Sequence, residues 1–223
     1  MSQDPQFVQA AFASIAPKYV LANHVLSLGI DVLWRKRVAK IVHELDPQRL
    51  LDVATGTGDL ALEIAKTCPE TEIVATDFCP EMLEVAEKAG VANTMVADAM
   101  NLPFSDAEFD VVTVAYGLRN MESWVNAARE MKRVLTRGGS LIILDFSLPK
   151  GVLKEPYRAY LHHVLPKLAG VIAGNRGAYE YLSESIERFP SGEEMEELLK
   201  DAGFENARSI PLTGGISSIY VAS

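Results

Sequence analysis

The chain has little cysteine, no basic excess and no long apolar run, and each shortage argues against a class of protein. Only two of its 223 residues are cysteines, Cys68 and Cys79, and they lack the spacing of a disulfide framework or of metal ligands. We expect two ordinary thiols in a reducing compartment and no bound metal. The formal net charge of −9 argues against nonspecific binding of nucleic acid, which needs a basic surface to neutralise phosphates.

Membrane and export signals are equally scarce. No apolar run approaches the roughly 18 residues that a membrane-spanning helix needs. Residues 1–5 are polar and acidic, unlike the start of a signal peptide. We therefore expect a cytoplasmic protein with, at most, peripheral contact at the inner face of the membrane. Its length suits one sizeable structural domain.

The most informative stretch is Leu50–Ala61, LLDVATGTGDLA. An apolar run leads into Gly56 and Gly58, and Asp59, a good N-cap, opens a helical pattern, so the stretch predicts a strand, a tight turn and a helix. Asp77 follows 19 residues after Gly58 (77 − 58), behind the next buried-strand pattern, where an acid can hold a ribose diol. Gly56, Gly58 and Ala61 also fit the dinucleotide pattern, which keeps a nicotinamide or flavin cofactor open.

Strand and helix patterns alternate over the following hundred residues, which predicts an α/β fold with a parallel sheet covered on both faces. A Gly138-Gly139 turn is expected before a strand over Ser140–Phe146. A helix over Ser191–Ala202 is expected to begin with a capping box of Ser191 and Glu194. The last two strands, Phe204–Leu212 and Ile216–Ala222, read as a hairpin that makes one strand antiparallel.

Helical patterns flank this core in sequence. Residues 1–48 are expected to form an N-terminal helical cap, in which Tyr19, Asn23, His24 and Trp34 would matter if the cap covers a ligand. Residues 49–223 form the cofactor-binding domain, with the less regular segment 148–190 as a helical insertion on the substrate side. The whole is expected to be one structural domain.

Several motifs then narrow the family. Asp98 and Ala99 follow the third expected strand, Tyr116-Gly117-Leu118-Arg119-Asn120 follows the fourth, and a helix–GlyGly–strand passage precedes the fifth. In this order they resemble the class I S-adenosylmethionine-dependent methyltransferases. With the stretches at residues 26–30, 178–186 and 212–216, the chain resembles the ubiquinone/menaquinone biosynthesis C-methyltransferase family over nearly its whole length.

The resemblance implies a Rossmann-like fold with a seven-stranded, mostly parallel sheet in the order 3-2-1-4-5-7-6 and an antiparallel terminal strand. It also implies S-adenosylmethionine as cofactor. Gly56, Thr57 and Gly58 would face its methionine end, Asp77 would hold the ribose hydroxyls, and Asp98 with Ala99 would meet the adenine.

The implied reaction is C-methylation of a reduced polyprenyl quinone precursor, and demethylmenaquinol is the expected acceptor. A benzoquinol is the alternative acceptor, and a nicotinamide-dependent oxidoreductase or a noncatalytic cofactor binder are alternatives of another class. The resemblance makes Arg119, Asn120 and Tyr19 the catalytic candidates. Arg119 would stabilise a phenolate, and the proton would pass to an ordered water, to Tyr19 or to a histidine, the candidates being His24, His162 and His163. The expected partner is a lipophilic quinol, and a homodimer is left open.

Overall fold

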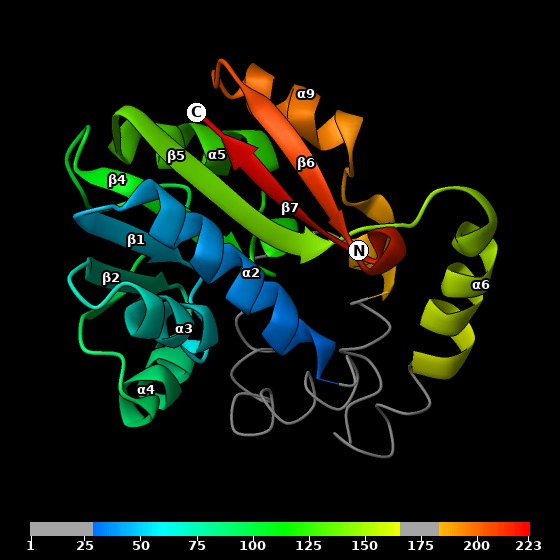
Figure 1. Ribbon diagram of the computed structural model, residues 1–223, viewed down its shortest axis with the longest axis horizontal. Coiled ribbons are helices and arrows are strands. Elements are labelled where there is room, and N and C mark those ends of the chain that lie inside the picture. The colour runs from blue at the N-terminus through cyan, green and yellow to red at the C-terminus, as the bar shows by residue number, and fades with distance from the viewer. Residues whose placement is uncertain (1–28, 166–182) are drawn as a thin grey trace.

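The computed structural model describes residues 29–165 and 183–223. Seven strands within these ranges form one sheet in the order β3-β2-β1-β4-β5-β7-β6 (Figure 1). Strands β1 to β5 pair in parallel, whereas β7 is antiparallel to both β5 and β6. This confirms the expected strand order and the antiparallel terminal strand. The strands are β1 (Arg49–Val53), β2 (Glu72–Asp77), β3 (Thr94–Val96), β4 (Phe109–Ala115), β5 (Leu135–Phe146), β6 (Ala207–Leu212) and β7 (Ser217–Ala222).

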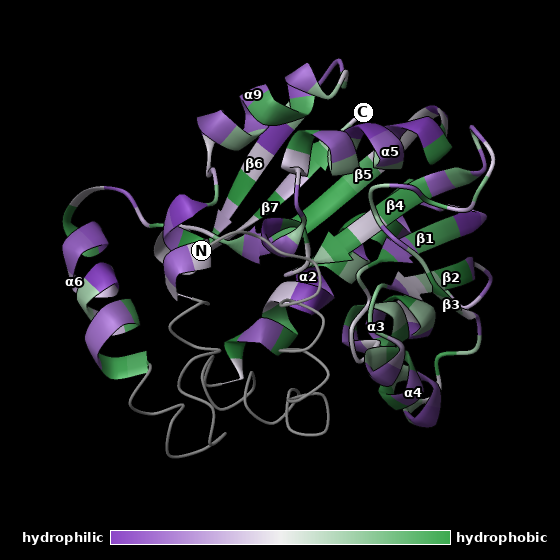
Figure 2. Cartoon of the chain, turned by 180° about the vertical axis from the view of Figure 1, so that it is seen from behind, coloured by the Kyte–Doolittle hydropathy of each residue, from purple (hydrophilic) through white to green (hydrophobic). Residues whose placement is uncertain are grey.

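Helices pack on both faces of the sheet because its inner strands are apolar on both sides. On β4, Val111 belongs to the core that α2 and α3 cover, and its neighbour Val112 belongs to the core that α5 and α9 cover. Figure 2 shows β4 and β5 mostly in the hydrophobic colour, while α9 carries much of the hydrophilic colour. The helices are α2 (Ile30–Leu45), α3 (Asp59–Thr67), α4 (Pro80–Ala89), α5 (Trp124–Val134) and α9 (Glu193–Asp201).

Two expected helix caps are wrong. The N-cap of α3 is Gly58, with φ 82°, and Asp59 is the first helical residue. The N-cap of α9 is Gly192, with φ 62° and no side-chain cap, so no capping box forms at Ser191. In both places the chain must turn through positive φ to enter the helix, a conformation that glycine adopts without steric cost. The Gly192 N–H also donates to Tyr220 Oη at 3.1 Å, which fixes the start of α9.

The expectation that a Gly138-Gly139 turn precedes the fifth strand is also wrong. Strand β5 begins at Leu135 and runs through both glycines. Its pairing with β4 shifts register between Phe109 and Val111, and Gly138 has φ 84°. The glycines therefore form an irregularity within the strand, since a bulge inserts extra residues without ending the ladder.

The segment after β5 stands at one side of the sheet, beyond the carboxyl end of β5 (Figure 1). It contains η2 (Gly151–Leu153), α6 (Lys154–Ala159) and η3 (Tyr160–Val164). Its inner face buries Leu161 and Leu165 with Ile186 from the helical residues 183–188. Within the described ranges, no helix is long and apolar enough to cross a membrane.

Candidate active site

The site lies where the loops after β1 and β4 meet. Strand β1 lies between β2 and β4, so the chain leaves β1 toward β2 and later returns on the other side to β4. Such a switch point opens a crevice at the carboxyl ends of the strands. The two loops touch closely, because a Cβ on Gly117 would come within 2.6 Å of Ala54 Cβ. Only glycine fits at this crossing.

The two glycines in the turn after β1, Gly56 and Gly58, have different structural roles. Gly56, with φ 58°, has open space where a Cβ would stand and lines the pocket. Gly58 has φ 82°, and its Cβ would come within 2.5 Å of Val91 Cγ2. Gly58 is not among the pocket-lining residues. Gly56 therefore leaves room for a ligand, whereas Gly58 allows the turn to pack against Val91.

The pocket has a volume of about 180 Å³ and brings together most of the predicted residues. Tyr19 and His24 lie outside the described residues. Arg119 is not on the pocket surface, and His162 and His163 are exposed on η3 and do not line the pocket. The predicted residues that line it are Gly56, Thr57, Asp77, Asp98, Ala99 and Asn120.

Asp77 ties the end of β2 to the glycine turn. Its Oδ2 accepts the Gly56 N–H at 2.8 Å, and its Oδ1 accepts the Cys79 N–H at 2.9 Å. Burial raises the pKa of Asp77, and the N–H groups of Cys79, Gly56 and Phe78 oppose that rise. Because a carboxylate oxygen can accept more than one hydrogen bond, the side chain can hold the turn and still bind a hydroxyl in the pocket.

Asp52 is a pocket residue that the sequence analysis missed. It lies in β1, fully buried, and its Oδ1 and Oδ2 accept hydroxyl hydrogen bonds from Thr113 and Thr55, each at 2.6 Å. Burial raises its pKa to about 6, against the lowering effect of the two hydroxyls; the charge of Asp77 adds to the rise. The available signal was an acid inside an apolar strand, since a charge is rarely buried without a role or a partner.

The other predicted cofactor residues are held by local contacts. Thr57 donates its hydroxyl to Asp59 Oδ2 at 2.6 Å, across the first turn of α3. Asp98 is exposed at the far side of the pocket, and its Oδ1 accepts the Met100 N–H at 2.9 Å. This bond bends the chain so that Ala99 also faces the pocket. A short Asx-type turn thus fixes the loop after β3.

The loop after β4 carries the conspicuous Tyr-Gly-Leu-Arg-Asn motif and folds around one carbonyl group. The Tyr116 carbonyl accepts Arg119 Nη1 at 2.6 Å and Asn120 Nδ2 at 3.3 Å. Arg119 Nη1 also donates to Asp145 Oδ1 at 2.7 Å, and both side chains are almost fully buried. Tyr116 itself has φ 57°, a strained conformation for a tyrosine that the surrounding contacts must hold.

Charge is distributed unevenly around the pocket. Its only lining cation among the described residues is Arg35, which pairs with Asp31 at 2.7 Å. The lining carboxyl groups are Asp52, Asp59, Asp77, Asp98 and Glu122. A pocket with this excess of carboxylates attracts cations and hydroxyl donors, and it repels diphosphates by the same electrostatics.

Comparison of the sequence with known proteins places the chain among methyltransferases. The ubiE/COQ5 methyltransferase family matches residues 1–223. A Deinococcus radiodurans protein named demethylmenaquinone methyltransferase is 45% identical over 222 residues, which cover 97% of this chain and 92% of that protein. A Geobacter protein named ubiquinone/menaquinone biosynthesis C-methyltransferase UbiE is 40% identical over 232 residues, which cover 100% and 98% of the two chains.

A solved structure agrees in fold. A SAM-dependent methyltransferase of Thermotoga maritima, described as a possible histamine N-methyltransferase, aligns with a TM-score of 0.68. The alignment covers 97% of this chain and 99% of that chain at 21% sequence identity. At this identity the likeness concerns the fold alone, which confirms the Rossmann-like methyltransferase architecture.

Proposed function

The chain belongs to the ubiE/COQ5 methyltransferase family, and we propose that it methylates a ring carbon of demethylmenaquinol. Family membership makes it an S-adenosylmethionine-dependent C-methyltransferase of quinone biosynthesis and sets aside the nicotinamide oxidoreductase. The choice of a naphthoquinol over a benzoquinol follows relatives such as the Deinococcus protein, whose name specifies demethylmenaquinone. The observation that carries the proposal is the acidic pocket at the β1–β4 switch point.

The pocket residues fit S-adenosylmethionine. Space beside Gly56, where a side chain would intrude, allows close approach of a ligand to the main chain. We assign Gly56 and Thr57 to its methionine end, with Gly58 shaping the turn, Asp77 to the ribose hydroxyls, and Asp98 with Ala99 to the adenine. The carboxylates favour its ammonium and sulfonium charges. When bound, S-adenosylmethionine supplies a methyl group on a positively charged sulfur.

The chain's own residues must make the acceptor carbon nucleophilic. A phenol has a pKa near 10, and its ring carbon becomes a good nucleophile only when the hydroxyl ionises. We assign Arg119 to favour that ionisation through its permanent charge, Asp145 to hold the guanidinium in place, and Asn120 to face the acceptor from the pocket wall. Tyr19 is assigned to the substrate side on the family resemblance alone.

The acceptor's polyprenyl tail adds a lipid partner. A quinol with a long isoprenoid chain partitions into the bilayer, since each buried CH₂ contributes about 0.8 kcal/mol. The enzyme must therefore meet its substrate at the membrane surface, and we propose peripheral contact there. The homodimer stays a prediction.

Product analysis tests the proposed reaction. The full chain is incubated with S-adenosylmethionine and with chemically reduced demethylquinones of both ring types, and methylated products are read by mass spectrometry. We expect a product one methyl group heavier from the naphthoquinol, and its loss in Asp77→Ala. Turnover of the benzoquinol alone would reverse the substrate assignment. Binding of the methyl donor without any product would identify a noncatalytic binder.

A further inference from the structure

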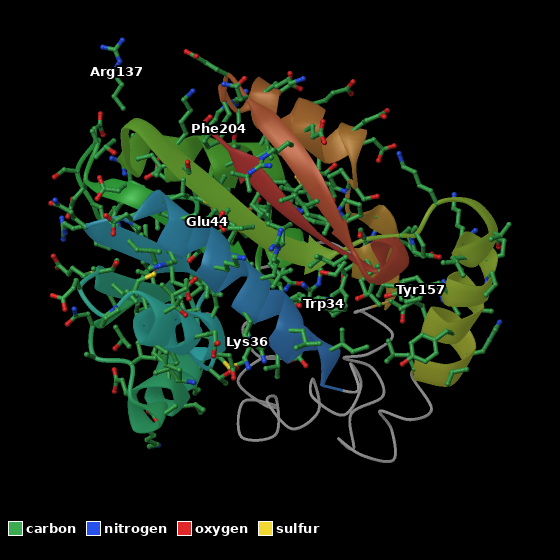
Figure 3. All side chains as sticks on the ribbon, in the orientation of Figure 1. Trp34, Lys36, Glu44, Arg137, Tyr157 and Phe204 are labelled. Carbon is green, nitrogen blue, oxygen red and sulfur yellow. The ribbon has the colours of Figure 1, made fainter. Side chains whose placement is uncertain are left out.

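Helix α2 and the segment η2 both contact one short turn. The turn is η4 (Thr213–Gly215), which joins β6 to β7. Trp34 Nε1 on α2 donates to Thr213 Oγ1 at 2.9 Å. From η2, Leu153 Cδ1 approaches to 3.3 Å of the place where a Cβ on Gly214 would stand. Trp34 and, on α6, Tyr157 are labelled in Figure 3, on the two helices that flank η4.

Exposed apolar side chains lie at or next in sequence to Trp34 and Leu153, the residues that contact this turn. Val152 is 91% exposed and Leu33 is 63% exposed, the two highest values among the large apolar side chains of the described residues. Leu153 is 52% exposed. We call Leu33, Val152 and Leu153 the η4-edge patch. Other apolar residues of the same segment, such as Leu161, are buried, so the segment has a core of its own and the patch is left outside it.

Exposed cations occur on both segments that carry the η4-edge patch. On α2, Lys36, Arg37 and Lys40 follow Leu33 at spacings of three, four and seven residues, which puts them on one helix face. All three are exposed, as are Lys150 and Lys154 next to η2. Within the described ranges, none of these five side chains makes an ion pair; the described pairs involve other residues.

This cationic face is unusual on a chain of net charge −9. The compensating acids lie elsewhere: α9 carries Glu193, Glu194, Glu196 and Glu197, and Figure 1 shows α9 on the far side of the sheet from the N-terminal end of α2. Exposed cations therefore accompany the apolar patch, and the exposed acid beside Lys154, Glu155, pairs with Arg158 at 3.7 Å. This combination of cations and apolar side chains orients the molecule toward an anionic, partly apolar surface.

We propose that the η4-edge patch and its cations dock the enzyme on an anionic phospholipid bilayer. Apolar side chains enter the headgroup boundary while lysine and arginine remain at the charged surface, a combination typical of peripheral binding. The inference deepens the proposed function and rests on it in one respect, that the acceptor is lipid-borne. The patch and the pocket share the carboxyl edge of the parallel strands, so docking brings the pocket entrance to the bilayer.

Vesicle flotation tests the docking directly, without turnover. The full chain is mixed with phosphatidylcholine vesicles that contain or lack phosphatidylglycerol. We expect binding only with phosphatidylglycerol, and its loss in high salt. Leu33→Ser/Val152→Ser/Leu153→Ser should lower the partition coefficient about tenfold or more. Lys36→Gln/Arg37→Gln/Lys40→Gln should lower it roughly fivefold per charge.

Two controls lie at the other end of the fold. Leu45→Ser removes an exposed apolar side chain from the C-terminal end of α2, and Arg137→Gln removes an exposed cation that Figure 3 shows far from Tyr157. Both should float like wild type. Flotation independent of phosphatidylglycerol, or patch variants that float like the controls, would overturn the proposal. So would a wild-type dimer that the serine variant converts to a monomer without lipid, because the occupant would then be a second copy.

Turnover separates this proposal from the proposed function. On a water-soluble quinol with a shortened tail, the serine variant should match wild type, whereas on quinol embedded in anionic vesicles it should lose most of its rate. Equal losses on both substrates would refute docking as the cause. If neither substrate is methylated yet phosphatidylglycerol-dependent flotation persists, the proposed reaction fails and the docking surface stands.

Discussion

Removal of the Arg119 guanidinium should affect stability and rate by amounts that can be told apart. Arg119→Ala leaves Asp145 buried without the cation that contacts it at 2.7 Å. Breaking a buried pair on one side typically costs about 3–5 kcal/mol. A domain with about 5 kcal/mol of stability that loses about 4 kcal/mol would remain roughly 85% folded. Partial unfolding could then explain only a small fall in rate.

The catalytic effect should be much larger than that. Loss of one preorganised group that stabilises developing negative charge typically costs about 10²–10³ in kcat. The assay measures urea unfolding and initial rates at low temperature on the same samples, and normalises each rate to the folded fraction. Cofactor affinity should stay within a few fold, because Arg119 does not line the cofactor pocket.

The pH–rate profile shows whether charge or structure is responsible. If Arg119 lowers the pKa of the substrate hydroxyl, Arg119→Ala should move the rising limb to higher pH. Asp145→Asn removes the anion that offsets Arg119, so it should move the same limb to lower pH. Arg119→Lys should recover most stability but only part of the rate, since a point charge lacks the planar fork. Normalised rates near wild type, with both limbs unmoved, would make the pair purely structural.

Three further predictions concern the cofactor side of the pocket. Asp77→Ala should weaken S-adenosylmethionine binding in calorimetry by about 1.5–3 kcal/mol per lost hydrogen bond; unchanged affinity in a folded protein would contradict the ribose assignment. Gly56→Ala should lower the affinity for S-adenosylmethionine, and its φ of 58° should make the substitution cost about 1–2 kcal/mol of stability. Gly58→Ala should cost clearly more stability, because its Cβ meets Val91. Equal urea midpoints for the two variants would refute the different roles assigned to the two glycines. For Asp52, a native pKa of about 6 against an ordinary 3.8 means that the native state holds the proton more tightly. Stability should therefore fall by about 2 kcal/mol as pH rises from 4 to 7. Asp52→Asn should flatten this slope, and an unchanged slope would assign it to another group.

Much of the fold could be predicted because short apolar runs that alternate with helical patterns indicate buried strands. The terminal hairpin expected over Phe204–Leu212 and Ile216–Ala222 is present as β6 (Ala207–Leu212) and β7 (Ser217–Ala222). The helix caps could not be predicted in the same way. Ser191 has good capping chemistry, yet the chain enters α9 through Gly192 because the preceding backbone is held by Tyr220 from β7. Capping propensity is a local preference, and tertiary contacts overrode it.

The site was predictable where its residues form a local pattern. The glycine turn, Asp77 and the loop after β3 are each short motifs, and the structure brings them to one pocket. The partner of Arg119 was out of reach, because Asp145 lies 26 residues away and meets it only through the pairing of β4 with β5. Asp52 looked like part of an apolar strand. Its raised pKa comes from burial, which a sequence without a register does not reveal.

Charge location, more than total charge, decides what this molecule can bind. A net charge of −9 argues against broad contact with a polyanion, yet it averages over two opposite regions. The pocket concentrates carboxylates around Asp52 and Asp77, while the exposed face of α2 carries Lys36 and Arg37. An acidic pocket favours a cationic cofactor, and the cations on the exposed face of α2 favour contact with an anionic membrane. Because both lie toward the carboxyl edge of the sheet, a protein that is acidic overall can present its pocket to a negatively charged bilayer.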